Sequence, residues 1–111
     1  MDVEQYKQLA KLIRDNKTYK VYDLPQLEDL DISLTELHPK ESTNGHSHSG
    51  ADEVYVFFDG EGTIEIDSEI IAVRAGDIIP VKEGAFHKVH NKGNKDLKFW
   101  AIFEKYEGRG K

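Results

Sequence analysis

Short runs of strand-forming residues, separated by glycine turns, fill most of this chain and limit the folds that it can adopt. They follow one another from about residue 19 to residue 103, and turn sequences such as Asp59-Gly60-Glu61-Gly62 and Ala75-Gly76-Asp77 lie between them. Glycine permits the positive φ angles that tight turns require. Short strands with short connections pair in an antiparallel manner and form a barrel or a sandwich. The sequence therefore predicts an all-β fold, a small antiparallel β-barrel, for residues 17–104.

The predicted strands are rich in Val, Ile, Phe and Tyr, the residue types that favour extended backbone. They cover residues 19–24, 30–38, 46–48, 54–58, 63–66, 70–73, 78–81, 87–91 and 97–103. Between two of them, Ile66-Asp67-Ser68-Glu69-Ile70 predicts a tight hairpin.

One amphipathic α-helix is predicted before the barrel, over residues 1–16. Asp2 is its expected N-cap and Gln5 the reciprocal partner of a capping box. Apolar residues then recur at helical spacing, at Val3, Tyr6, Leu9, Ala10 and Ile13. We expect this helix to cover the outside of the barrel, with dimerisation as the alternative. The last segment, residues 105–111, mixes charges with glycine and predicts a flexible C-terminal tail.

Composition narrows the classes of partner. The chain of 111 residues supports one domain, and its net charge of -6 disfavours nucleic acid or an anionic membrane as a partner. It contains no cysteine, which excludes disulfides and thiolate ligands. The first residues lack the basic and apolar runs of a secretory signal, and no stretch approaches transmembrane length. A cytoplasmic location and a small polar molecule as ligand are therefore predicted.

A cluster of histidines and one carboxylate predicts a metal site. His46 and His48 are two residues apart, so on a strand both side chains point to the same face. Glu53 and His87 complete a set of three imidazoles and one carboxylate. Fe(II), Mn(II), Ni(II) and Zn(II) accept such mixed nitrogen and oxygen ligands, and open coordination positions would admit water or substrate. The expected cofactor is one divalent ion of this group.

The same residues resemble the two motifs of the cupin superfamily. The run from Gly45 to Gly60 is similar to the first motif, and the run from Gly76 to Asn91 is similar to the second. One departure lies in the second motif, where the proline is Pro80 and Lys82 occupies the family's usual proline position. The resemblance implies a small single-domain cupin of the cupin 2 conserved barrel type, with a double-stranded β-helix or jelly-roll fold. It also implies the ligand set His46, His48, Glu53 and His87.

Other side chains are assigned by their position relative to this site. If Glu53 points to the metal, Tyr55 and Phe57 line the interior of the barrel and are candidate substrate contacts. Val54, Val56 and Phe58 then face outward and need cover, either from the N-terminal helix or from a second subunit. Because cupins commonly pair through one sheet, a homodimer is predicted. His38 and His90 are interpreted as ordinary histidines outside the site.

Three functions fit these residues, and whether the chain is an enzyme is left open. The first is metal-assisted chemistry on a small oxygen-rich molecule, such as the isomerisation of a sugar or sugar phosphate, because the motif order is similar to that of sugar-isomerase cupins. The second is an Fe or Mn dioxygenase or a decarboxylase. The third is a non-catalytic module that binds a small ligand. A phosphate-binding signature is not found before His46, and this fold class hosts many unrelated reactions.

Overall fold

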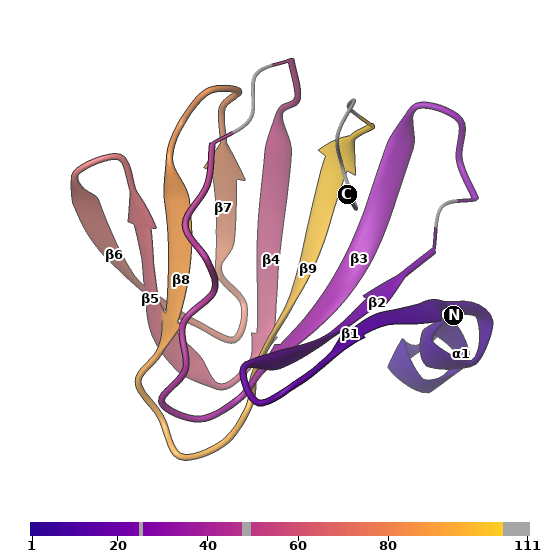
Figure 1. Cartoon of the computed structure of the whole chain (residues 1–111), viewed down its shortest axis with the longest axis horizontal. Coiled ribbons are helices and arrows are strands. Elements are labelled where there is room, and N and C mark those ends of the chain that lie inside the picture. The colour runs from indigo at the N-terminus through magenta and orange to yellow at the C-terminus, as the bar shows by residue number, and fades with distance from the viewer. Residues whose placement is uncertain (25, 48–49, 106–111) are drawn as a thin grey trace.

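Two antiparallel β-sheets face each other across the molecule (Figure 1). The computed structural model describes residues 1–24, 26–47 and 50–105. In spatial order, the larger sheet contains β1 (Lys11–Asp15), β2 (Tyr19–Asp23), β3 (Leu30–Leu37), β9 (Leu97–Glu104), β4 (Glu53–Asp59) and β7 (Ile78–Val81). The smaller sheet contains β6 (Glu69–Arg74), β5 (Glu61–Ile66) and β8 (His87–Asn91). This arrangement, preceded by one helix, confirms the predicted all-β class.

The space between the sheets is filled by alternate residues of facing strands, as the two-residue period of a strand requires. Phe57 of β4 is fully buried, and Phe99 of β9 lies opposite it with the ring centroids 5.1 Å apart. Ile64 of β5 and Val89 of β8 are paired on the other side of the core. The predicted hairpin at Asp67 is confirmed, since Ile66 pairs with Glu69 across it.

The N-terminal helix is shorter than predicted. Helix α1 spans Val3–Leu9 and has the expected capping box between Asp2 and Gln5. At Ala10 the backbone becomes extended, and residues 11–15 form β1 instead of continuing the helix. The prediction of a helix over 1–16 is therefore wrong in its second half. Pairing with β2 satisfies the backbone groups of β1 that face β2, and β1 becomes the edge strand of the larger sheet. Within the described residues, no helix is long and apolar enough to span a membrane.

Helix α1 packs on the outer face of the larger sheet. The Tyr6 side chain is 3% exposed, and its ring meets Trp100 edge-on at 4.8 Å. Its hydroxyl donates a hydrogen bond of 2.7 Å to the carbonyl of Ile32. Phe58 stacks on Trp100, with the centroids 5.5 Å apart. The helix thus covers part of the outer face, while Ile78 on β7 stays 64% exposed.

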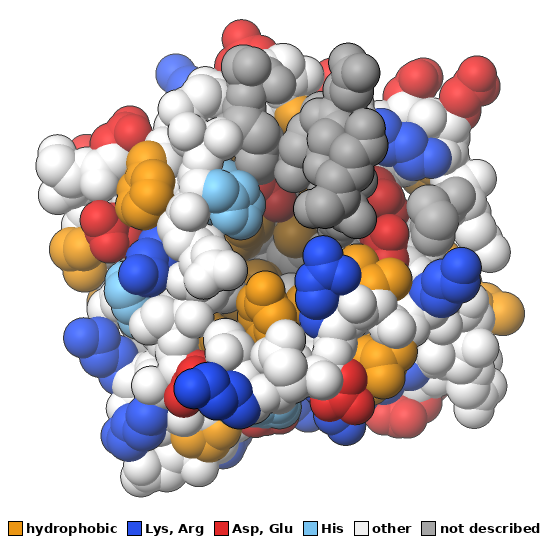
Figure 2. All heavy atoms as spheres, viewed as in Figure 1, with side chains coloured by type: hydrophobic (Ala, Val, Ile, Leu, Met, Phe, Trp, Pro, Cys, Tyr) orange, Lys and Arg blue, Asp and Glu red, His pale blue; other side chains and the backbone are white. Residues whose placement is uncertain are grey.

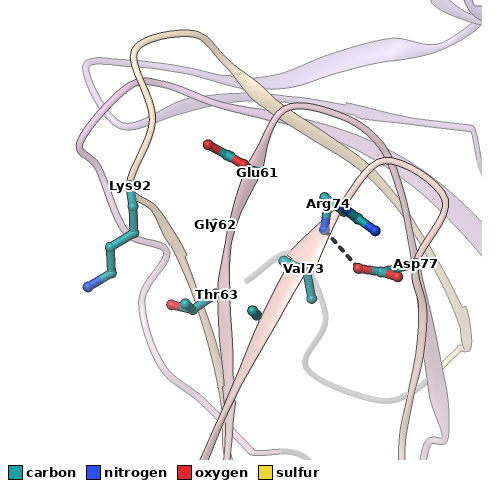
Figure 3. A pocket seen from close by; sticks show the side chains of 8 residues that line it. Glu61, Gly62, Thr63, Val73, Arg74, Asp77 and Lys92 are labelled. Carbon is teal, nitrogen blue, oxygen red and sulfur yellow. Dashed lines mark hydrogen bonds between the residues drawn. The ribbon is translucent and has the colours of Figure 1, made fainter.

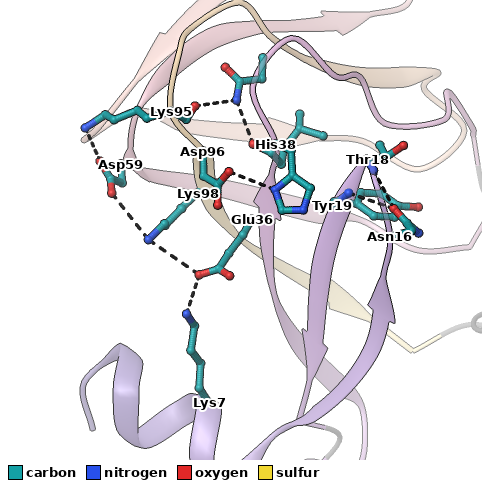
Figure 4. A network of polar contacts seen from close by, with 12 residues as sticks. Lys7, Asn16, Thr18, Tyr19, Glu36, His38, Asp59, Lys95, Asp96 and Lys98 are labelled. Atoms are coloured by element: carbon teal, nitrogen blue, oxygen red, sulfur yellow. Dashed lines mark hydrogen bonds and ion pairs between the residues drawn. The ribbon is translucent and has the colours of Figure 1, made fainter.

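Ionic contacts join α1 to the same sheet (Figure 4). Glu36 of β3 is 5% exposed, and Lys7 of α1 reaches its carboxylate at 2.6 Å. Lys98 of β9 lies 3.8 Å from Glu36 and 3.9 Å from Asp59, and Lys95 contacts Asp59 at 2.8 Å. A buried carboxylate is costly without such partners. Burial alone would lower the pKa of Lys7, but the hydrogen bond and charge of Glu36 raise it overall.

Two predicted segments, the strand 46–48 and the tail 105–111, are only partly covered by the described residues. His46 forms only an isolated bridge, opposite His87, so the structure has no named strand there. His48 lies outside the described residues. Lys105 is held by a hydrogen bond of 3.0 Å from its N–H to the carbonyl of Asp29. The remainder of the predicted tail, 106–111, also lies outside the described residues.

Candidate metal centre

Backbone hydrogen bonds hold His46 and His87, two of the predicted ligands, side by side. The N–H of His46 donates to the carbonyl of His87 at 3.2 Å, and the N–H of His87 donates back at 3.0 Å. The imidazole rings meet edge-on with centroids 4.5 Å apart. Gly45 permits this approach, because a Cβ atom there would lie 2.2 Å from the ring of Phe86. The loop before His46 and the start of β8 are therefore brought together by backbone pairing and by the absence of a side chain at Gly45.

Glu53, at the start of β4, completes the described part of the cluster. Its Oε1 lies 3.2 Å from Nε2 of His87, and the two residues are 7% and 1% exposed. Ligand atoms bound to one ion at about 2.0–2.2 Å lie roughly 3.0–3.5 Å apart. The observed separation falls in that interval.

Backbone carbonyls orient both imidazoles. Nδ1 of His87 lies 3.1 Å from the carbonyl of Ala85, and Nδ1 of His46 lies 3.2 Å from the carbonyl of Asn44. A carbonyl can only accept, so these hydrogen bonds place the proton on Nδ1 and leave the Nε2 lone pair for another partner. Metal-binding histidines are oriented in the same way in proteins. The Nε2 atoms of His46 and His87 therefore have the protonation that a metal ligand requires.

The environment of His87 also changes its pKa. Burial alone would lower the pKa, because it disfavours the charged imidazolium. The hydrogen bond with Glu53, the hydrogen bond to the Ala85 carbonyl and the charge of Glu53 outweigh that effect, so the pKa is raised above 6.5. Protonated His87 is thus the favoured partner of Glu53 when no metal competes with the proton.

The fourth predicted ligand cannot be placed. His48 lies outside the described residues, although His46, Glu53 and His87 lie together. Across residues 1–24, 26–47 and 50–105, no group of three or more His, Asp or Glu side chains is arranged to hold a metal ion. The ligand set His46, His48, Glu53 and His87 therefore stays a prediction.

The two candidate substrate contacts occupy different depths. Tyr55 is 7% exposed and meets His87 edge-on with ring centroids 5.7 Å apart, while Phe99 stacks on it at 5.3 Å. Phe57 is fully buried and belongs to the hydrophobic core. Tyr55 thus borders the histidine cluster, and Phe57 lies one row deeper. Contact of either side chain with a substrate stays a prediction.

A row of polar side chains on β3 was missed by the sequence analysis. Asp31, Ser33 and Thr35 are 6%, 3% and 7% exposed and alternate with Ile32 and Leu34. Such alternation usually places the apolar residues inward. Here Leu34 faces outward beneath α1, and the polar residues share the inner face with Leu37. The sequence does not reveal that the polar residues of β3 face inward, because the outward apolar residues are covered by α1, which lies far from them in the sequence.

The remaining histidines have partners outside the cluster, as predicted. Nδ1 of His38 lies 3.0 Å from Asp96 at the start of the β9 region. Nδ1 of His90 lies 2.7 Å from the hydroxyl of Ser42. Both histidines are therefore ordinary hydrogen-bonded residues.

Two hollows lie at different places on the molecule. Figure 2 shows one face hollowed near its centre, with hydrophobic side chains on the floor and a histidine beside them. A second hollow of about 420 Å³ lies at the end of the barrel remote from Glu53, where β5 begins and β6 ends (Figure 3). Arg74, Asp77, Glu61 and Lys92 line it, and the backbone N–H of Arg74 donates a hydrogen bond of 2.8 Å to Asp77. This second hollow contains none of the predicted ligands.

Comparison with known proteins identifies the family. The profile of the cupin domain family matches residues 33–103, which include both predicted motifs. An oxalate-binding protein from Thermotoga maritima is 35% identical over 66 residues, which are 60% of this chain and 54% of that protein. The matched region spans about half the length of the curated relatives.

Solved structures share the fold. A protein with a double-stranded β-helix domain from Klebsiella pneumoniae superimposes with a TM-score of 0.78, at 19% identity, over 94% of this chain and 87% of that one. A predicted oxalate decarboxylase from Thermotoga maritima gives 0.71 at 24% identity, over 87% and 92% of the two chains. The double-stranded β-helix predicted from the cupin motifs is therefore confirmed.

Proposed function

The chain belongs to the cupin family, and on that premise we propose that it binds one divalent metal ion and uses it to act on a small oxygen-rich molecule. The proposed ligands are His46, His48, Glu53 and His87. The observation that carries the proposal is the 3.2 Å separation of Glu53 Oε1 and His87 Nε2, beside the bridged His46. A buried carboxylate and a buried imidazole at this distance provide donor atoms for one cation.

A bound ion would polarise a carbonyl or hydroxyl oxygen or lower the pKa of a water molecule. The residues of the chain supply the surroundings for that chemistry. The carbonyls of Ala85 and Asn44 hold the two imidazoles in one tautomer. Tyr55 packs edge-on against His87 and limits the directions from which a molecule can approach. Fe, Mn, Ni and Zn all suit this ligand set.

The first candidate reaction is the isomerisation of a sugar, which needs a polarised carbonyl and neighbouring hydroxyl. The second candidate is decarboxylation or oxidation of a small carboxylate. It is favoured by one observation, the 35% identity to an oxalate-binding protein. A non-catalytic binding module is the third reading, since no general base separate from Glu53 is assigned.

Metal content tests the proposal directly. Purified protein is loaded separately with Fe(II), Mn(II), Ni(II) and Zn(II), passed through a desalting column and measured by elemental analysis. We expect one ion per chain in the natural protein and loss of that ion in the double variant His46→Ala, His48→Ala, with the fold retained by circular dichroism. The double variant His38→Ala, His90→Ala makes the same chemical change outside the cluster and should keep its ion. Full occupancy in the first variant would overturn the ligand assignment.

Activity measurements then separate the reactions. Conversion of aldoses to ketoses under nitrogen would support an isomerase and exclude a need for oxygen. Turnover that occurs only in air with iron would support the dioxygenase. If no turnover occurs with any metal, while a sugar or an organic acid raises the melting temperature, the binding module is favoured.

A further inference from the structure

The inner face of β3 contains a buried carboxylate that the metal ligands do not use. Asp31 is 6% exposed, so more than nine-tenths of its surface is buried. Its Oδ1 atom is buried and has no hydrogen-bond partner in the described part of the chain. An acceptor in this state is unfavourable until a donor reaches it. Resting on the proposed function, we propose that Asp31 accepts hydrogen bonds from an uncharged polyhydroxylated substrate bound at the metal centre.

The register of the larger sheet puts Asp31 in the same row as the metal centre. Glu53 pairs with Phe103, and Phe103 pairs in turn with Asp31. Directly paired residues in adjacent strands point their side chains to the same face. Two steps between strands amount to about 10 Å. Asp31 therefore lies across the inner face from Glu53, with the buried ring of Phe103 between them.

The separation of Asp31 and Glu53 sets a minimum length for a ligand that reaches both. A molecule that binds the ion near Glu53 and also donates to Asp31 must extend past Phe103. A chain of several hydroxylated carbons can do so and can lay its C–H groups on the aromatic ring. Oxalate, with a single carbon–carbon bond, is too short to reach both positions.

The charges of the inner face select against anions. On the inner face of the described residues, the buried ionisable side chains are the carboxylates of Asp31 and Glu53 and the imidazole of His87, and no lysine or arginine is buried there. On this side of the sheet, Lys11 pairs with Asp23 and Arg14 with Val21, but both cations lie on the exposed edge strand β1. A carboxylate or phosphate next to Asp31 would meet a like charge in a poorly solvated place. Hydroxyl groups, which donate, would not.

Hydroxyls on the same strand extend the site. Ser33 and Thr35 follow Asp31 on the inner face and are almost fully buried. Ser33 is paired with Ala101, whose small side chain leaves the hydroxyl facing the row that contains Tyr55. Hydroxyl groups thus continue along β3 from the row of Asp31 and Glu53 into the deeper rows of Tyr55 and Phe57, and Ser33 supplies a donor and an acceptor next to Asp31 for a bound polyol.

Binding of matched probes tests the inference. Xylitol and D-xylonate have the same five-carbon chain and differ in one terminal carboxylate, and oxalate represents a short dicarboxylate. Isothermal titration calorimetry on Mn(II)-loaded protein should show tighter binding of xylitol than of either anion. The variant Asp31→Asn should weaken xylitol binding about tenfold, because a hydrogen bond to a charged acceptor contributes on that order. It should leave oxalate binding equal or stronger.

Controls separate this site from the metal site. Glu69→Gln removes a carboxylate from the exposed start of β6 and should leave all three affinities unchanged. Asp31→Ser is the second variant should Asp31→Asn fail to fold, which circular dichroism detects. Tighter binding of oxalate or D-xylonate than of xylitol, or unchanged xylitol affinity in the Asp31 variants, would overturn the inference.

Failure of the proposed function gives a different result. If the natural protein does not retain Mn(II), the metal proposal fails, while the metal-free protein still tests Asp31. In that case xylitol should raise the melting temperature of the natural protein more than that of Asp31→Asn. Absence of any shift with xylitol in the natural protein would overturn the role of Asp31.

Discussion

Glu53 and His87 face each other across the mouth of the barrel, with 3.2 Å between Oε1 and Nε2. In the metal-free protein this contact is made best by the imidazolium, and the pKa of His87 is raised above 6.5. A metal ion needs the neutral imidazole instead. The proton and the metal therefore compete for one nitrogen, and the two forms of the protein should respond to pH in opposite directions.

The metal-free protein should lose stability as pH rises. A folded-state pKa above the unfolded value means that His87 contributes its full stabilisation below 6.5 and loses it as pH rises through the folded-state pKa. The effect is measured by urea unfolding of chelator-treated protein at pH values from below 6.5 to above the folded-state pKa of His87. The variant His87→Gln should lack this component, whereas His90→Gln should retain it. An identical pH dependence in the natural protein and in His87→Gln would contradict the prediction.

Metal binding should strengthen over the same interval. As pH rises through the raised pKa, fewer protons must be displaced from His87, so the affinity for Mn(II) or Zn(II) increases. The rise in melting temperature on adding metal should therefore be larger above this pKa than below it. A metal-induced shift that shrinks with rising pH would argue against His87 as a ligand.

The hydroxyl of Tyr6 should account for much of the attachment of α1. It donates to the Ile32 carbonyl at 2.7 Å and lies 3.2 Å from the carbonyl of Tyr22. The variant Tyr6→Phe keeps the ring on Trp100 and removes only these hydrogen bonds, so it should lower the free energy of unfolding by about 1–2 kcal/mol. Leu9→Ala, at a side chain that is 59% exposed, should change it by less than about 0.5 kcal/mol. Equal effects would show that α1 is not held by Tyr6.

Asn91 should be essential to the turn between β8 and β9. Its side-chain amide donates to the carbonyls of Leu37 and Lys95, both at 2.9 Å, and its Oδ1 accepts from Gly93 N–H at 2.9 Å. The residue is 3% exposed, so Asn91→Ala leaves these groups without partners and should cost about 2–4 kcal/mol in chemical unfolding. The matched variant Asn94→Ala, at an exposed position, should be nearly neutral. A loss below about 1 kcal/mol for Asn91→Ala would mean that water replaces the amide.

The sequence predicted the strands of the barrel well, because turn chemistry and β-forming residues act locally. The end of α1 could not be predicted, since Ala10 and Ile13 continue the helical stripe and only pairing with β2 selects a strand for residues 11–15. The inward direction of Asp31 was missed for a similar reason, because α1 supplies a second apolar layer for Leu34. The contacts of His87 with His46 and with Glu53 agree with the cupin motifs, whereas the sequence does not reveal the hydrogen bonds that orient the rings.

A homodimer stays a prediction, and the outer face of β4, β7 and β9 is where it would form. Ile78 is 64% exposed and pairs with Val56, which in turn pairs with Trp100, so apolar side chains continue across these strands. Helix α1 covers the Trp100 end of this row through Tyr6 but leaves Ile78 exposed. A second copy would bury that remainder, as expected for an exposed apolar patch.

A single charge should test this interface. Placing Lys at position 78 buries an unpaired ammonium group if two copies meet there, so Ile78→Lys should raise the dissociation constant of the dimer about 100-fold or more. Light scattering after size exclusion should show a dimer for the natural protein and a monomer for the variant. Ile70→Lys makes the same change at a side chain that is 62% exposed on β6, in the other sheet, and should leave the dimer intact. A monomeric natural protein would refute the homodimer, and a dimer that survives Ile78→Lys would move its interface to another face.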